Sequence, residues 1–288
     1  MAIYTLGSIN IDHVYQVPHL AKPGETLAAT SYTKGLGGKG ANQSVAASKA
    51  GAKVFLIGAI GPDSNWVLDE LNHYGVNTSS VLHLTTATGH AIIQVDPAAE
   101  NNIILYPGAN RQITDAHATR ALASARPNDL LLVQNETSAQ SATIRLAADM
   151  GLRVLYTPAP FDLVPLQLAI PYAHLLLMNA GEAAEMTRAL GGLPDCDVII
   201  TKGADGAEWH SPKTSPLSIP SFPVNPIDTT GAGDCFAGFI AAALDAGLAP
   251  EQALRRASAA AALQVTRKGA AAAMPNADDV DSFLESAP

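Results

Sequence analysis

Cysteine, basic residues and charge in general are scarce in this 288-residue sequence. The two cysteines, Cys196 and Cys235, are too few for a disulfide framework and lack the spacing of metal ligands, so we expect buried thiols in a reducing compartment. Lysine and arginine number 17 against 26 acidic residues, and the formal net charge is −9. Without a global basic field, nucleic acid is an unfavourable partner.

Neither a membrane-spanning run nor a signal peptide is evident. The N-terminal segment reaches Asp12 without a basic region or an adequate apolar stretch. Residues 163–181 lack Asp, Glu, Lys and Arg, but Pro165, Pro171 and Asn179 would interrupt a spanning helix. Hydrophobic residues make up 48% of the chain and charged residues 15%, which is typical of a compact globule rather than a disordered chain. We expect a cytoplasmic protein that does not bind membranes.

Short apolar runs alternate with alanine-rich segments of helical period. The runs with the length and composition of buried strands are residues 3–6, 54–58, 130–133, 154–156, 175–178 and 198–201. The segments with helical period are residues 41–50, 116–125, 139–150 and 250–265. The alternation predicts βαβ units, and hence a doubly wound α/β domain with a mostly parallel sheet covered by helices on both faces.

Two segments interrupt this alternation and predict a small separate sheet. Residues 90–95 and 102–106 have the pattern of an antiparallel hairpin, and residues 12–33 have the composition of a loop with a short strand. We expect a lid of residues 12–33 and 89–106 on a main domain of residues 1–11, 34–88 and 107–288. The edge of a small sheet exposes unpaired N–H and C=O groups, which favours pairing with a second copy and predicts a homodimer.

Two glycine-rich segments each precede a predicted helix. Residues 35–42 match the spacing of a dinucleotide-binding fingerprint, but no convincing strand leads directly into them and no acidic residue stands at the expected distance of about 20 residues beyond Gly40. They are not a P-loop either, because Gly40 follows Lys39 where a P-loop requires Ser or Thr. This segment is either a close backbone approach to a ligand or a helix-entry loop. Residues 228–234 place amides of small residues at a helix N-terminus, which is a cradle for phosphate. Asp234 is either a helix cap or a base that deprotonates an attacking hydroxyl.

Polar side chains follow three of the predicted strands. Asn10 and Asp12 follow the first, Glu136 follows the third, and Asn179 with Glu182 follow the fifth. The carboxyl ends of parallel strands open the ligand crevice in such sheets. Each residue alone is compatible with a turn or a helix cap. Together they predict a site for a ligand rich in hydroxyl groups.

In order along the chain, these motifs resemble the PfkB family of carbohydrate kinases and, within it, the ribokinase branch. The matching segments are residues 7–12, 23–26, 37–42, 179–182, 228–234 and 266–270. The resemblance implies a ribokinase-like, Rossmann-like fold whose β-sheet lid also serves as a dimer clasp. It further implies ATP-dependent phosphate transfer to a sugar hydroxyl, with D-ribose as acceptor and D-ribose 5-phosphate as product.

The resemblance also implies a role for individual residues. The sugar ligands would be Asn10, Asp12, Gly38, Lys39, Asn42 and Glu136. Asp234 would be the base, with an anion hole of Gly231, Ala232 and Gly233. The nucleotide would contact Asn179, Thr201, Gly203, Gly206 and Ser258, and Glu182 would hold Mg²⁺ through water. An activating K⁺ would be bound by Asp228 and by the carbonyls of Thr230, Gln264, Arg267 and Gly269.

Two positions depart from the family pattern. Ala273 stands where ribokinases tend to have a serine that ligates potassium, and Ser258 stands where relatives often have Asn or His near adenine. The sequence therefore leaves open both the potassium requirement and the preference for a phosphoryl donor.

Other functions stay open on sequence alone. A phosphosugar kinase would need cationic side chains for the existing phosphate, and no arginine cluster accompanies Lys39. A nucleoside kinase needs apolar surface for a base, yet aromatic residues are 5% of the chain. A nucleoside or another unphosphorylated sugar stays as the alternative substrate. A non-catalytic, sugar-responsive regulator would have no need of Asp234, and a nicotinamide oxidoreductase would need the context that residues 35–42 lack.

Overall fold

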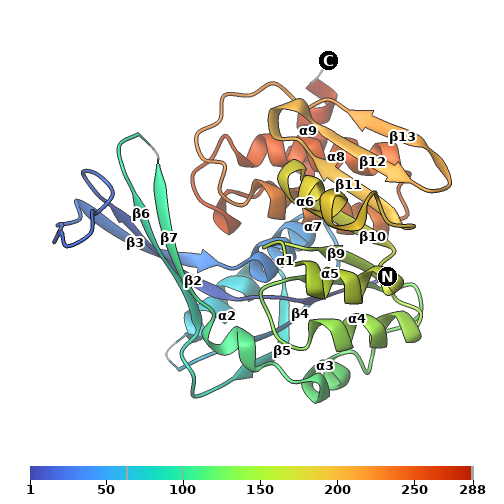
Figure 1. The fold of residues 1–288 in the computed structure, drawn as a ribbon, viewed down its shortest axis with the longest axis horizontal. Helices are drawn as coiled ribbons and strands as arrows, with labels where there is room; N and C mark the ends of the chain where they lie inside the picture. Colours follow the sequence, from blue (N-terminus) through green and yellow to red (C-terminus); the bar gives the residue numbers. More distant parts are fainter. Residues whose placement is uncertain (63, 99, 287–288) are drawn as a thin grey trace.

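The computed structural model describes residues 1–62, 64–98 and 100–286. A nine-stranded sheet forms the centre of the molecule (Figure 1). Its strands, in spatial order, are β13 (Thr214–Ile219), β12 (Ala207–Ser211), β11 (Asp197–Thr201), β10 (Leu175–Asn179), β9 (Arg153–Thr157), β8 (Leu130–Gln134), β1 (Ile3–Leu6), β4 (Val54–Ile60) and β5 (Asn77–His83).

The sheet is parallel from β11 to β5, and β12 and β13 add an antiparallel edge. The six predicted apolar runs lie in β1, β4, β8, β9, β10 and β11, which are neighbours in this parallel region. Strands buried on both faces need continuous apolar runs, because each face of the sheet is covered by helices. The prediction of a mostly parallel α/β sheet is confirmed.

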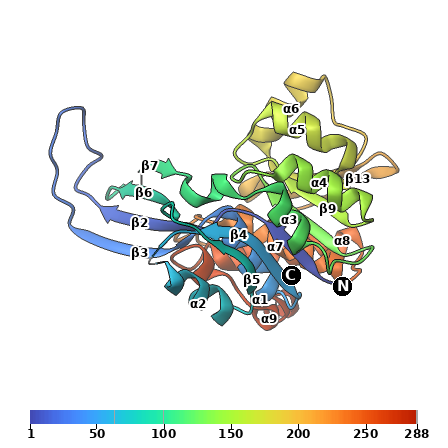
Figure 2. The same ribbon diagram turned by 90° about the horizontal axis from the view of Figure 1, so that it is seen from below.

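Helices cover both faces of the sheet (Figures 1 and 2), and a hydrophobic core lies between the helices and the sheet on each face. One core is formed with α1 (Lys39–Lys49), α2 (Asn65–His73), α7 (Ala232–Asp245), α8 (Pro250–Gln264) and α9 (Ala277–Ser286). The other is formed with α3 (Asp115–Ala121), α4 (Gln140–Asp149), α5 (Leu163–Ala169) and α6 (Ala180–Leu190). Within β1 the side chains alternate: Ile3 belongs to the first core, and Tyr4 and Leu6 to the second. This strand is therefore held from both faces, as its apolar sequence predicts.

A second sheet projects from the main body (Figures 1 and 2). We call it the lid sheet, and its strands, in spatial order, are β3 (Ser31–Gly37), β2 (Asn10–Gln16), β6 (Gly89–Val95) and β7 (Asn101–Tyr106). The predicted hairpin is confirmed as β6 and β7, which pair antiparallel. The division of the chain into a main domain and a lid with the bounds given above stays a prediction.

The prediction of a loop with a short strand at residues 12–33 is wrong at both ends of this segment. β2 begins at Asn10 and β3 continues to Gly37, and the two strands pair over their whole length. Asn10 and Asp12 therefore lie within a strand of the lid sheet and not in a turn after β1. β2 mixes polar and apolar side chains on both faces, so its sequence carries no clear two-residue period, and pairing with β3 and β6 stabilises it instead.

Shorter 3₁₀ segments complete the fold: η1 (Gly108–Gln112), η2 (Ile170–Tyr172), η3 (Gly203–Asp205) and η4 (Ala271–Ala273). Cys196 and Cys235 are both free; Cys235 is buried as expected, whereas Cys196 is only partly buried. Among the described residues, none of the helices combines the length and hydropathy that a bilayer-spanning segment requires.

Candidate active site

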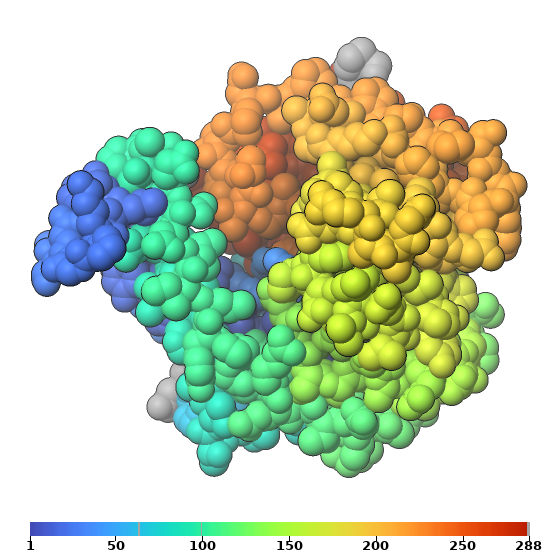
Figure 3. Space-filling view, viewed as in Figure 1, coloured from blue at the N-terminus to red at the C-terminus, as the bar shows by residue number. Residues whose placement is uncertain are grey.

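Asp234 lies in the first turn of α7 and lines a cavity of about 210 Å³. The surface is hollowed between the lid sheet and the main body (Figure 3). Gly231 precedes the helix with a φ of 80°, a left-handed conformation that favours glycine, and a side chain there would crowd Ala270. The amides of the first turn of a helix have no intrahelical acceptor and carry the positive end of the helix dipole. Residues 231–233 thus present a cradle for an anion beside the Asp234 carboxylate, although the Ala232 amide also donates to the Thr229 carbonyl (3.2 Å).

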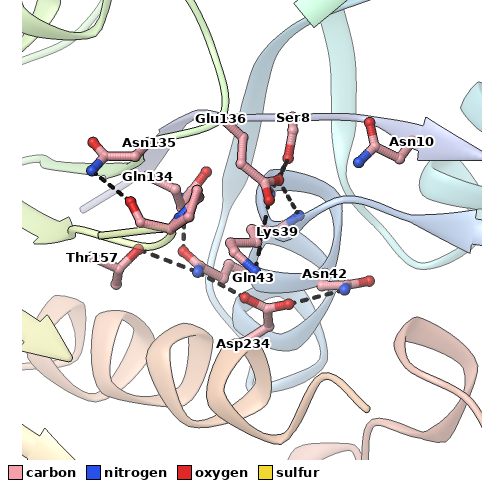
Figure 4. Close-up of polar contacts among 12 residues, drawn as sticks. Ser8, Asn10, Lys39, Asn42, Gln43, Gln134, Asn135, Glu136, Thr157 and Asp234 are labelled. Carbon is pink, nitrogen blue, oxygen red and sulfur yellow. Dashed lines mark hydrogen bonds and ion pairs between the residues drawn. The ribbon is translucent and has the colours of Figure 1, made fainter. Parts of the chain in front are cut away.

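Two amide side chains of α1 hold the Asp234 carboxylate (Figure 4). Asn42 Nδ2 donates to Oδ2 at 3.0 Å, and Gln43 Nε2 donates to Oδ1 at 2.9 Å. Gln43 is held in turn by Gln134, whose Nε2 donates to Gln43 Oε1 at 2.7 Å. Gln43 and Gln134 are buried residues that sequence reasoning missed. The chain of amides fixes the carboxylate from the side of α1, and leaves it facing the cavity.

The surroundings of Asp234 increase its affinity for a proton. Burial raises the pKa of the Asp234 carboxyl, while the Lys39 ammonium and the amides of Asn42 and Gln43 act in the opposite direction. A carboxylate whose pKa is raised, in hydrogen-bond reach of a substrate hydroxyl, is suited to general-base catalysis.

Lys39 begins α1 and lies between two carboxylates. Its Nζ is 3.6 Å from Glu136 Oε1, and its backbone amide donates to Glu136 Oε2 at 3.3 Å. Ser8 also donates to Glu136. Burial alone would lower the pKa of Lys39, but the carboxylates of Asp234 and Glu136 outweigh it and raise this pKa. The ammonium therefore stays charged in the site.

A glycine sets the entry of the chain into α1. Gly38 precedes the helix with a φ of 94°, and a Cβ there would lie 2.7 Å from the Ser8 carbonyl oxygen. Only glycine allows this approach of the α1 N-terminus to the segment after β1. This approach is to the backbone of the chain itself at Ser8, and it brings Lys39 beside Glu136. The predicted close approach to a ligand stays a prediction.

Asn10 and Asp12 lie two residues apart on β2, so their side chains leave the same face of the strand. Asn110 Nδ2 donates to Asn10 Oδ1 at 2.8 Å and also bonds the backbone of Ile9, which fixes the start of β2. Burial, followed by the negative charges of Glu136 and Asp234, raises the pKa of Asp12 to about 6. The site therefore contains three carboxylates that influence one another, those of Asp12, Glu136 and Asp234, and the ammonium of Lys39. Asn110 is a further residue that the sequence did not indicate.

The other side of the cavity contains Asn179, Glu182 and Thr201. Asn179 ends β10 and caps α6, because its Oδ1 accepts from the Glu182 amide at 2.9 Å and Glu182 Oε2 accepts from the Asn179 amide at 2.9 Å. The helix-cap interpretation therefore holds for this pair, and the same pair also lines the cavity. Burial raises the pKa of Glu182.

The structure brings together some predicted site residues and leaves others apart. The cavity is lined by Lys39, Asn179, Glu182, Thr201, Gly231, Ala232, Gly233 and Asp234. Asn42 and Glu136 are bonded to two of these lining residues. Gly203, Gly206 and Ser258 are outside this lining. Gly203 begins η3 after β11, and Ser258 is a buried residue of α8.

The predicted potassium ligands lie beside the anion cradle, in the loop before α7, at the end of α8 and in the loop that follows α8. Asp228 accepts from the amides of Thr230 and Gly269, each at 2.9 Å. Burial alone would raise the pKa of Asp228, but these hydrogen bonds lower it. The carbonyls of Thr230 and Gly269 accept from the side-chain amide of Gln264, at 2.7 Å and 3.0 Å. The sequence predicted a role for the backbone carbonyl of Gln264. It did not predict that the side chain of Gln264 would donate to two of the other carbonyls.

Comparisons with known proteins show which family the chain and its fold resemble. The family model for pfkB family carbohydrate kinases matches residues 2–277. The ribokinase of Haemophilus influenzae is 37% identical over 98% of this chain and 98% of its own length. The solved ribokinase of Thermotoga maritima is 32% identical, with a TM-score of 0.90 over 99% of this chain and 100% of that chain. The ribokinase of Arabidopsis thaliana, solved with ribose and ATP, is 26% identical, with a TM-score of 0.89 over 99% of both chains. With its parallel sheet, its lid and a carboxylate at the glycine-rich start of α7, the chain belongs to the pfkB family of carbohydrate kinases.

Proposed function

We propose that this protein transfers the γ-phosphate of ATP to the 5-hydroxyl of D-ribose, giving D-ribose 5-phosphate and ADP. The observation that carries the proposal is the position of Asp234. Its carboxylate lies at the N-terminus of α7, fixed by Asn42 and Gln43, in a cavity that also contains Lys39 and Glu182. The similarity to ribokinases over nearly the whole chain supports ribose as the acceptor.

Asp234 would act as the base. Its carboxylate accepts the proton of the sugar hydroxyl as that oxygen attacks the γ-phosphorus, and the bond to the β–γ bridging oxygen breaks so that ADP leaves. The proton then passes from Asp234 to solvent. The amides of Gly231, Ala232 and Gly233 would stabilise the charge on the transferred group, because donors aimed at developing charge lower the barrier. The raised pKa of Asp234 supports this role.

The sugar would be held by Asn10, Asp12, Gly38, Lys39, Asn42 and Glu136. Carboxylates accept hydrogen bonds from hydroxyl groups, and Asn10 and Asp12 can bind neighbouring hydroxyls because they share one face of β2. The site has more negative than positive charge, because the carboxylates of Asp12, Glu136 and Asp234 face the single ammonium of Lys39. This negative balance disfavours a sugar that already carries a phosphate and supports an unphosphorylated one.

The nucleotide would extend from the anion cradle along Asn179, Thr201, Gly203, Gly206 and Ser258. Mg²⁺ fits the donor set, because this ion keeps several waters and binds through one or two carboxylates together with substrate phosphates. Among the described residues there is no cluster of three or more His, Cys, Asp or Glu side chains for a metal. Glu182 lines the cavity and uses Oε2 for the Asn179 amide, so we assign its other oxygen to a water of the ion. When bound, Mg²⁺ would neutralise charge on the phosphates.

Potassium is a different case. Gln264 donates to the carbonyls of Thr230 and Gly269, and the backbone carbonyl of Gln264 accepts from the Arg267 amide at 3.0 Å. Three of the carbonyls predicted to bind K⁺ therefore already accept hydrogen bonds. The set does not fit a potassium ion while Gln264 keeps this position, and no catalytic step is assigned to the ion.

We further propose a homodimer that forms through the lid sheet. β7 is an edge strand, and four of its apolar side chains, Ile103, Ile104, Leu105 and Tyr106, are between 46% and 62% exposed. An exposed apolar edge favours pairing with a second chain. The cytoplasmic location predicted from the sequence stays a prediction.

The experiment that tests the activity is ADP release with ATP and Mg²⁺ across a panel of acceptors. The panel contains ribose, deoxyribose, fructose, fructose 6-phosphate, 2-keto-3-deoxygluconate, adenosine and inosine. We expect kcat/KM to be highest with ribose. Turnover with another acceptor only would keep the kinase and overturn the sugar assignment, and no turnover with any acceptor would contradict the proposed reaction.

A further inference from the structure

The side chain of Gln264 joins the two loops on either side of the anion cradle. Gln264 ends α8 and its relative exposure is 0%. Its Nε2 donates to the carbonyl of Thr230, in the loop before α7, at 2.7 Å, and to the carbonyl of Gly269, in the loop after α8, at 3.0 Å. Carbonyl oxygens only accept hydrogen bonds, so the amide nitrogen, and not Oε1, must face them.

The orientation of this amide leaves its other end unsatisfied. Oε1 of Gln264 is buried and has no hydrogen-bond partner among the described residues. Turning the amide over would place Oε1 against two carbonyl oxygens, which repel it. The two carbonyls therefore fix the side chain in a position where its partial positive charge faces them.

Other hydrogen bonds also join the loop before α7 to the segment after α8. The Asp228 carboxylate accepts from the amides of Thr230 and Gly269, and the Val265 carbonyl accepts from the amides of Ile227 (2.7 Å) and Asp228 (3.1 Å). Gly231 follows Thr230 directly and is the N-cap residue of α7, which begins at Ala232. The position of the cradle amides thus depends on how the two loops are joined.

A monovalent cation joins loops by replacing its hydration shell with carbonyl oxygens. Here the two carbonyls that would supply this shell face an NH₂ group instead. The neighbouring segment, which contains Ala273 in place of a serine ligand, is bonded by an ammonium as well. Lys49 Nζ donates to the carbonyls of Met274 at 2.8 Å and Ala271 at 3.4 Å. A neutral amide donor and an ammonium of the chain itself therefore satisfy these carbonyls.

We propose that the Gln264 amide is a built-in substitute for a monovalent cation, so that this protein is independent of K⁺. Gln264 is a positioning residue: it acts through the loop that carries Gly231, Ala232 and Gly233 and does not touch substrate. The expected effects on kcat rest on the proposed ribose kinase activity. The expected effect of K⁺ on Tm does not depend on that activity.

The first test compares the wild-type protein in KCl and in tetramethylammonium chloride at equal ionic strength. We expect kcat with ribose and ATP to agree within about twofold between the salts, and Tm to show no shift specific to K⁺. Activation of the wild type by K⁺ of about fivefold or more, which is in the range of an ordinary coupling between two sites, would overturn the proposal.

The second test uses Gln264→Ala, which exposes the two carbonyls. In tetramethylammonium chloride we expect kcat to fall by about tenfold or more while the Kd for ADP changes less, and KCl should restore most of the loss. K⁺ should also raise the Tm of this variant, because an ion that binds only the folded state stabilises it. Gln252→Ala, at an exposed glutamine in the first turn of α8, is the matched control and should show, like the wild type, no difference between the two salts.

The outcomes separate this inference from the proposed reaction. If Gln264→Ala does not fold, Gln264→Ser leaves the same space for an ion and adds a hydroxyl oxygen as a ligand, and the same K⁺ rescue is expected. A variant that equals the wild type in both salts would contradict the inference. If ribose supports no turnover in any salt, the proposed function fails, and the K⁺-dependent Tm of the variant still decides whether Gln264 replaces an ion.

Discussion

Asp12→Asn should stabilise the folded protein above about pH 6. The pKa of Asp12 is raised from 3.8 to about 6, first by burial and then by the charges of Glu136 and Asp234. Between these two values the folded state binds a proton that the unfolded state releases, so the free energy of unfolding falls as pH rises through this window. A difference of about 2 pKa units corresponds to at most about 3 kcal/mol, and partial solvent exposure of Asp12 reduces it.

Urea denaturation of the wild type and of Asp12→Asn at a series of pH values from about 4 to 8 measures this difference. We expect the two proteins to be equally stable near pH 4, and the variant to be more stable by about 1–3 kcal/mol above pH 6. Asp69→Asn, at an exposed residue of α2, is the control and should show no such dependence. A variant that is less stable than the wild type at pH 7.5 would refute the reasoning.

The same substitution should weaken ribose binding. An ionised carboxylate forms hydrogen bonds worth about 1.5–3 kcal/mol with hydroxyl donors, so KM for ribose should rise by about 10- to 100-fold in Asp12→Asn. In the wild type, KM should rise as pH falls through about 6, because protonation removes one acceptor. A KM for ribose that is independent of pH between about 5 and 7 would remove Asp12 from the sugar site.

Three further predictions concern the base, the ammonium and the lid. Asp234→Asn should lower kcat by about 10²- to 10⁴-fold with the Kd for ADP nearly unchanged, as measured by steady-state kinetics and calorimetry, and unchanged turnover would exclude Asp234 as the base. Lys39→Ala should chiefly raise KM for ribose, and an effect on KM for ATP alone would move Lys39 out of the sugar site. Ile104→Asp, which charges an exposed residue of β7, should convert a homodimer to a monomer in light scattering, and a wild-type monomer at micromolar concentration would contradict the dimer.

The sequence predicted the parts of the fold that depend on local pattern. The parallel strands are apolar over their whole length, and helices such as α8, with Pro250 at its first position, have a local start signal. For residues 12–33 only one short strand was predicted, and the length of β2 and β3 was missed, because their polar residues lie on both faces and the stability of these strands comes from pairing across the lid sheet. A strand that is stabilised by pairing, and that lacks an alternation of polar and apolar residues, is difficult to predict from the sequence.

Residues that surround the cavity were indicated by the sequence where a motif spans consecutive residues, as at residues 37–42 and 228–234. The supporting amides were not predictable, because their partners are remote in the chain. Gln134 and Gln43 are 91 residues apart, and Gln43 and Asp234 are 191 residues apart. Gln264 was expected to contribute a backbone carbonyl, and its side chain instead faces two of the other carbonyls. Such roles depend on rotamers and distances that only the folded chain defines.

The most direct test of the account is to identify the product that forms from ribose, ATP and Mg²⁺. Phosphorus NMR, coupled to the sugar protons, should show one D-ribose 5-phosphate for each ADP released by the wild type, and none with Asp234→Asn. ADP released without a sugar phosphate, or phosphate attached to a different hydroxyl, would contradict the assignment of Asp234 as the base for the 5-hydroxyl of ribose.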